Sequence, residues 1–449
     1  MAKRRGCLRL ILALAALVVL FAALAPLLPL NFLRPQVESG LSAALGRNVT
    51  VGAIKLRLLG GPRLTINGVT AKEDAAFGTG DFLKADEVSL DFALGEYLLH
   101  RRIVIHALAM TSPIITFSKN AGGAWSWTTI GQASGQTRRG GRLSLLFLLN
   151  ARSLVPLGLS ASTGQARLDN VRIDNATIKL TDATGSQPSK TTYRNISLRA
   201  AITHDSTGAS RAIGELAAKS DGDDRTEALK TTLPFDLTID ATRAAEIVVK
   251  GALGPGPLET RNFSAQSFKI TAEISSRVAA SRGRDSSARE GADRPGAGSE
   301  AGSVNATGHI SSSQIVIPAI NLSEHVAHAL RISRIGNMNP GTEIGSLETD
   351  FRTDQDVVRT PGLSLQQLDG LGDASASDGW FKLGSSLTLN YSATVLLSND
   401  ATGQAKGANP MIGAAITILE QNNRVSLPIQ VTGDLHNPQV QVDVFRIFR

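Results

Sequence analysis

Apolar and polar residues alternate along most of the chain beyond residue 50. A period of two predicts β-strands with one dry face and one solvated face, which is typical of antiparallel sheets. The pattern therefore predicts a mainly β protein. The clearest runs are Val88/Leu90/Phe92/Leu94, Leu233/Phe235/Leu237/Ile239, Phe268/Ile270/Ala272/Ile274 and Leu387/Leu389/Tyr391/Ala393/Val395/Leu397.

Residues that favour turns separate several of these runs. Asn67-Gly68, Asp174-Asn175 and Gly254-Pro255-Gly256-Pro257 predict reversals of the chain, because Gly and Asn tolerate a positive φ and Pro lacks an amide hydrogen. The segment Ser206–Leu229 has weak periodicity, and we expect it to be a loop.

Few segments have helical periodicity. These are Pro35–Gly46, Leu143–Ser153, Leu322–Ile332 and Ile412–Gln421. Four short helices are too few for the repeated β-α-β units of doubly wound or barrel α/β folds, which argues against both classes.

One segment is long and apolar enough to cross a membrane. Residues 10–33 carry no charge, and a helix of about 24 residues spans a hydrocarbon core of about 30 Å. Basic residues lie just before it, between Lys3 and Arg9, which predicts a cytoplasmic N-terminus and an exported body. A cleaved signal peptide is the alternative, but Pro26 directly follows the small residues Ala23 and Ala25, and we expect it to hinder cleavage.

The composition excludes some kinds of framework, site and partner. The chain has 449 residues and one cysteine, so a disulfide framework and a multi-thiolate metal site are excluded. The formal net charge of +7 is spread along the chain and does not indicate a nucleic-acid partner.

No motif for catalysis or cofactor binding is recognisable. The chain lacks a P-loop, a G-x-G-x-x-G turn between strand and helix, and a G-x-S-x-G elbow. His325 and His328 are the only histidines close in sequence, and no third ligand stands at a characteristic spacing. We therefore expect no enzyme activity, no cofactor and no metal site.

Several blocks, in order along the chain, carry a family resemblance. The apolar segment is followed by a short helix and by LGRNVTVGAIKLRLLGGPRLTINGVTA, residues 45–71. Residues 82–127 follow, with Pro113, Gly123 and Trp127 at pattern positions and Ser126 where Asn is frequent. Together they resemble the AsmA family of bacterial envelope proteins. Residues 346–444 resemble an AsmA-like C-terminal region, with Pro428, Gly433, Pro438 and Asp443 on its last element, whereas residues 143–303 match only as generic β structure.

The resemblance implies an organisation and a location. We expect a cytoplasmic N-terminus (1–9), a transmembrane anchor (10–33), an AsmA-like N-terminal domain (34–130), a middle β region with loops (131–278), a disordered linker (279–303) and an AsmA-like C-terminal region (304–449). The resemblance implies a single-pass protein of the bacterial inner membrane with a periplasmic body. It also implies a role in outer-membrane biogenesis and a relation to bridge-like lipid transfer proteins.

An apolar sheet face needs a cover, and the predicted helices are scarce. A sandwich, a barrel, or an extended curled antiparallel sheet that binds lipid acyl chains in a β-groove all remain possible. The resemblance favours the last of these, an extended curled sheet whose groove binds acyl chains and aids phospholipid transport between membranes. We expect the groove to be lined by Val88, Leu90, Phe92, Leu94, Leu387, Leu389, Tyr391, Ala393, Val395 and Leu397. The inner membrane, phospholipid and other envelope proteins are the expected partners. A non-catalytic scaffold or regulator of outer-membrane protein assembly is the alternative function.

Overall fold

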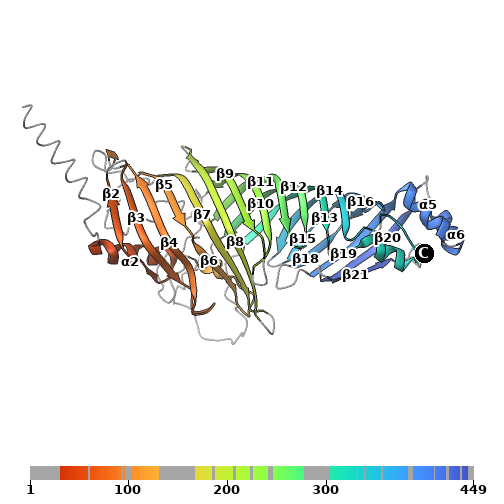
Figure 1. Ribbon diagram of the computed structural model, residues 1–449, viewed down its shortest axis with the longest axis horizontal. Helices are drawn as coiled ribbons and strands as arrows, with labels where there is room; N and C mark the ends of the chain where they lie inside the picture. The colour runs from red at the N-terminus through yellow and green to blue at the C-terminus, as the bar shows by residue number, and fades with distance from the viewer. Residues whose placement is uncertain are drawn as a thin grey trace, which may run out of the picture. The chain divides into compact units, whose positions relative to one another are not determined.

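The computed structural model describes residues 31–58, 61–93, 95–96, 104–130, 167–184, 188–205, 209–222, 226–240, 246–277, 304–318, 320–330, 332–337, 339–354, 357–382, 388–408, 410–420, 424–434 and 437–442. The chain divides into two compact units, Met1–His204 and Asp205–Arg449. The described part is mainly β, with mostly antiparallel pairing and few helices, as the alternating pattern predicts (Figure 1).

The first unit is a sheet flanked by short helices. Its helical segments are η2 (Asn31–Leu33), α2 (Arg34–Leu45) and η3 (Ser126–Thr129). Its strands are β1 (Val49–Thr50), β2 (Ile54–Arg57), β3 (Arg63–Lys72), β4 (Asp81–Phe92), β5 (Val104–Thr111), β6 (Ile114–Lys119), β7 (Arg167–Asp182) and β8 (Ser189–His204). Strands β1 and β2 both pair with β3, and β4 follows on the other side of β3.

Strands β5 and β6 behave as one interrupted strand. Both pair antiparallel with β4 and parallel with β7, and the register is the same before and after the break. Ser112 interrupts the strand at φ 48°, beside Asn175 of β7 at φ 56°. The Asn175 amide donates to the Ser112 hydroxyl at 3.2 Å, so the two left-handed residues support each other.

The second unit is an antiparallel meander with three helices at one end. Its helices are α4 (Leu322–Ala329), α5 (Asn399–Ala408) and α6 (Pro410–Leu419). Its strands are β9 (Ser210–Ser220), β10 (Leu229–Asp240), β11 (Glu246–Thr260), β12 (Ser264–Arg277), β13 (Val304–Ile317), β14 (Thr342–Asp354), β15 (Val357–Arg359), β16 (Leu363–Leu368), β17 (Gly372–Ala376), β18 (Gly379–Lys382), β19 (Thr388–Leu397), β20 (Ser426–Asp434) and β21 (Asn437–Val442). From β9 to β14 each strand pairs with the next.

Beyond β14 two strands are interrupted. Strands β15 and β16 lie one after the other along β14, and β17 and β18 lie one after the other along β19. Strands β20 and β21 complete the sheet.

Two sequence interpretations are wrong. The segment expected to be a loop, Ser206–Leu229, contains strand β9, whose inward positions are mostly small residues and therefore give weak periodicity. The expected turns at Asn67-Gly68, Asp174-Asn175 and Gly254–Pro257 lie inside β3, β7 and β11. Gly68, Asn175 and Gly254 have a positive φ within these strands. The pairing register shifts next to Asn175 and next to Gly254, as it does at a β-bulge.

Helices α2, α4 and α6 confirm three predicted helices, whereas α5 was not predicted. The predicted helix Leu143–Ser153 and the predicted linker 279–303 lie outside the described residues. Within the described ranges, no helix has the length and apolar character needed to cross a membrane. Residues 10–30 of the predicted anchor lie outside those ranges, so the anchor stays a prediction.

Candidate functional site

The six strands β9–β14 have two faces of opposite chemistry. Side chains at paired positions of neighbouring strands point to the same side of a sheet, so the pairing register assigns each residue to a face. We call the face that carries Leu233, Phe235 and Ile270 the apolar face. At its described positions every residue is aliphatic, aromatic, small or a hydroxyl residue, and none is charged. Its members include Ala212, Leu216, Leu233, Phe235, Leu237, Ile239, Val249, Gly251, Leu253, Phe268, Ile270, Ala272, Ile274, Ala306, Gly308, Ile310, Ser312, Leu347, Thr349 and Phe351.

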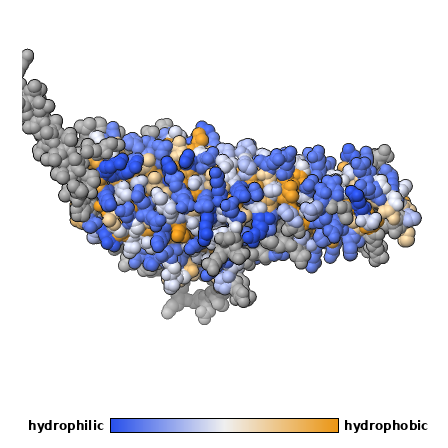
Figure 2. All heavy atoms as spheres, viewed as in Figure 1, coloured by the Kyte–Doolittle hydropathy of each residue, from blue (hydrophilic) through white to orange (hydrophobic). Residues whose placement is uncertain are grey.

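The opposite face of the same strands carries the charges. Arg211 pairs with Asp236 and Lys250 with Glu273 at 2.9 Å, and the His309 Nδ1 lies within hydrogen-bond distance of the Asp350 carboxylate, at 2.9 Å. These groups are exposed, so the polar face is solvated, and it adds little stability through its ion pairs. Figure 2 views one side of the molecule, where hydrophilic residues cover most of the described surface and hydrophobic residues show in patches between them.

On β10 the apolar face is mostly buried, with Leu233, Phe235 and Ile239 only 3%, 8% and 7% exposed, but on β11–β13 much of it lacks a cover among the described residues. Leu253, Ile270 and Ile310 are only half-buried, and Ile274 is 39% exposed. The described chain has two clusters of buried apolar side chains, and neither includes a residue of β9, β10 or β11. An aliphatic surface of this kind favours contact with an apolar ligand over contact with water.

At the other end of the unit the same face is covered. Helices α4, α5 and α6 place Val326, Ala405 and Ile416 against the sheet in a cluster that also contains Val395 and Leu397. Val395 and Leu397, which the sequence suggested as groove residues, therefore lie in a closed core. A larger set of aliphatic and alanine side chains completes the cluster, including Ile315, Leu322, Leu330, Ile335, Leu368, Leu371, Val425 and Leu427.

The other predicted residues of β19 have different surroundings. Leu389 is buried, whereas Tyr391 and Ala393 are half-buried. The Tyr391 hydroxyl lies 2.9 Å from the Thr360 hydroxyl, and burial raises the pKa of Tyr391. Leu387 lies outside the described residues.

In the first unit, Val88, Leu90 and Phe92 share one face of β4. Cross-strand pairing extends them into two apolar rows, Ile66–Val88–Met110–Ile173–Leu198 and Leu64–Leu90–Leu108–Val171–Ala200. All three are half-buried, and Leu94 lies outside the described residues. The apolar face predicted near the N-terminal segment is therefore continuous from β3 to β8.

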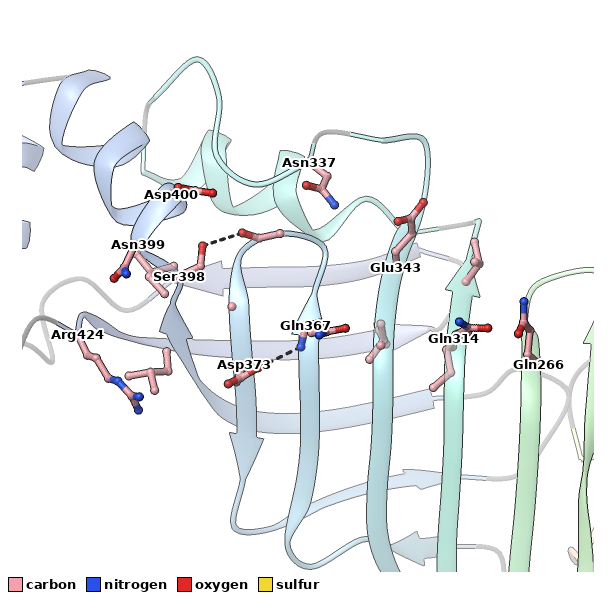
Figure 3. Close-up of a pocket in the computed structure, with 18 residues that line it drawn as sticks. Gln266, Gln314, Asn337, Glu343, Gln367, Asp373, Ser398, Asn399, Asp400 and Arg424 are labelled. Atoms are coloured by element: carbon pink, nitrogen blue, oxygen red, sulfur yellow. Dashed lines mark hydrogen bonds between the residues drawn. The ribbon is translucent and has the colours of Figure 1, made fainter.

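A separate cavity of about 970 Å³ opens near the helical end of the second unit, and polar residues dominate its lining (Figure 3). Gln266 and Gln314 stand on the neighbouring strands β12 and β13, and Gln367 stands on β16, with β14 and its Glu343 between β13 and β16. Gln314 and Gln367 have φ of 48° and 53°, and the backbone N–H of Gln367 donates to the Asp373 carboxylate at 3.0 Å. Amide and carboxylate groups do not favour acyl chains, so the chemistry of this cavity differs from that of the apolar face.

Comparison of the chain with models of protein families identifies its family. The model of the AsmA family matches residues 1–233. The chain belongs to the AsmA family. The match confirms the resemblance and covers the N-terminal domain and part of the middle region, whereas the expected AsmA-like C-terminal region lies beyond it. No curated protein and no solved structure matches the chain.

Sequence reasoning missed part of the site in this AsmA-family chain. The alternation correctly predicted strands at β10 and β12, but the predicted groove residues all lie on or next to β4 and β19. The row on β12 has the same alternating pattern as the row on β19, so the alternation alone does not distinguish uncovered strands from covered ones. For metal ions, the described residues contain no group of three or more His, Cys, Asp or Glu side chains that could hold one.

Proposed function

We propose that this AsmA-family protein is anchored in the bacterial inner membrane by residues 10–33, with its body in the periplasm. It binds phospholipid acyl chains on the apolar faces of its sheets and aids phospholipid transport between membranes during outer-membrane biogenesis. Family membership supports a role in the envelope in general. The observation that carries the lipid-binding part is the uncharged, partly uncovered apolar face of β9–β13.

Physical chemistry favours this use of the face. Each CH2 group removed from water contributes about 0.8 kcal/mol, so a two-chain lipid needs a continuous apolar surface outside a membrane. A charge on that surface would be costly to desolvate, and the described positions of the apolar face hold none. The headgroup stays in water, so binding needs no cofactor and no covalent chemistry.

Site-specific photocrosslinking in cells tests the proposal. A benzophenone amino acid replaces Ile270 on the apolar face, and its neighbour Thr271, on the polar face of the same strand, is the matched control. We expect a phospholipid adduct at position 270 and none at 271. Phe92 and Ser89 of β4 form a second pair for the first unit. Equal labelling at both members of each pair would contradict the proposal.

The scaffold alternative has one observation in its favour. The covered core beneath α4, α5 and α6 leaves no apolar face for lipid on that part of the described sheet. A scaffold or regulator of outer-membrane protein assembly predicts protein adducts at positions 92 and 270 without lipid adducts, so the same experiment separates the two functions.

A further inference from the structure

One tryptophan of the first unit is held rigidly while remaining exposed. Trp127 is 37% exposed and stacks on Trp125, with ring centroids 4.3 Å apart and planes 10° from parallel. Phe117 packs in a T-shaped arrangement with Trp127, with ring centroids 5.3 Å apart, and Phe117 in turn contacts Phe82. A large aromatic ring that packs against two other rings and still contacts solvent is typical of a preorganised contact surface.

A buried ion pair fixes the backbone that carries this ring. Arg47 pairs with Glu73, and their side chains are 1% and 3% exposed. The Arg47 guanidinium also donates to the Ser126 carbonyl at 2.6 Å and to the Thr129 hydroxyl at 3.3 Å, the two ends of η3. Burying two charges is costly, and the Arg47 Nε and one Glu73 oxygen have no hydrogen-bond partner. The Arg47 contacts hold η3 against the loop that follows α2.

The same loop leads back to the N-terminal apolar segment. Helix α2 has 12 residues and is therefore about 18 Å long, with Arg47 just beyond its C-terminal end. At its other end, Phe32 is 70% exposed, and only Asn31 separates it from residues 10–30, which carry no charge and lie outside the described residues. The chain thus connects two exposed aromatic residues to the segment expected in the bilayer.

We propose that Trp127 and Phe32 lie at the headgroup level of the membrane that anchors the protein, so that the α2–η3 end of the first unit rests on the bilayer surface. The inference depends on the anchor in the proposed function. Tryptophan is enriched at this level because its ring is apolar and its indole N–H can still find a hydrogen-bond acceptor. Arg34, two residues after Phe32, is exposed, and its guanidinium donates to the Glu38 carboxylate at 2.9 Å.

Tryptophan fluorescence tests the inference, because the chain has three tryptophans. The full chain is reconstituted into phosphatidylcholine vesicles as two variants. One carries W125F and W380F and keeps Trp127; the other carries W125F and W127F and keeps Trp380 of β18. Vesicles contain unlabelled lipid, lipid brominated near the ester carbonyl, or lipid brominated near the chain end.

We expect Trp127 to lose emission with brominated lipid, most strongly when the bromines lie near the carbonyl, and Trp380 to keep its emission. Phe32→Trp in a chain with all three tryptophans changed to Phe should be quenched like Trp127. Quenching of Trp127 no stronger than that of Trp380 would overturn the inference, as would equal access of aqueous iodide in vesicles and in detergent. A lipid adduct at position 270 without Trp127 quenching keeps the proposed function and removes the inference; quenching without an adduct does the reverse.

Discussion

The buried pair Arg47–Glu73 gives the sharpest stability prediction. Burial lowers the pKa of Arg47, whereas the negative charge of Glu73 favours the protonated guanidinium, so the buried cation depends strongly on its partner. Glu73→Gln leaves the guanidinium buried without a counter-charge, and removing one member of such a pair costs about 3–5 kcal/mol. Because a domain is stabilised by only about 5–15 kcal/mol in total, we expect a large loss of folding free energy in the first unit.

Urea unfolding of the W380F chain in detergent measures this loss, because Trp125 and Trp127 then report on the first unit alone. Lys72→Met is the matched control: Lys72 is the neighbour of Glu73, and its ion pair with Asp81 is exposed, so we expect a loss below about 1 kcal/mol. The double variant Arg47→Met/Glu73→Leu should lose less than the sum of Arg47→Met and Glu73→Leu, because no charge remains buried. A Glu73→Gln loss equal to that of Lys72→Met, or strictly additive losses in the cycle, would refute the reasoning.

Two further predictions concern the second unit, with urea unfolding followed by Trp380 in a W125F/W127F chain. Gly308→Ala should lower the free energy of unfolding by about 1–3 kcal/mol, because the added Cβ would meet the Thr271 carbonyl and lie 2.7 Å from the Phe351 ring. Gly403→Ala, on the open face of α5, should raise the free energy of unfolding by up to about 1 kcal/mol. Equal effects of the two substitutions would contradict the packing argument. Burial raises the pKa of Asp369, so the folded chain holds this proton to higher pH than the unfolded chain does, and stability should fall as pH rises from the unfolded pKa through the folded pKa. Asp369→Asn should remove that fall; an unchanged pH profile would contradict it.

The strand pattern was largely predictable, because alternation is a local property of the sequence. Leu233–Ile239 and Phe268–Ile274 are strand residues as predicted. Which apolar rows are covered was not predictable, since that depends on long-range packing of helices. Helix α5 illustrates the difficulty: its buried residues are Ala401, Thr402 and Ala405, and such small side chains give almost no helical periodicity.

Turn-forming residues were the main source of error in the fold. Gly68, Asn175 and Gly254 do adopt a positive φ, as their chemistry predicts, but within long strands rather than at hairpins. A bulge and a turn require the same backbone freedom, and only the pairing partners on either side distinguish them. The positions of conformational freedom were therefore predictable, whereas the topology at those positions was not.

The antiparallel meander from β9 to β14 has an evolutionary consequence. Each of these strands pairs with its immediate neighbours in the chain, so a hairpin added or removed between two of them changes few other pairings. Each added strand would lengthen the sheet by about 4.8 Å while preserving the alternation that separates its faces. Duplication of hairpins is thus a simple genetic route by which the length of such a sheet can change while its two faces keep their chemistry.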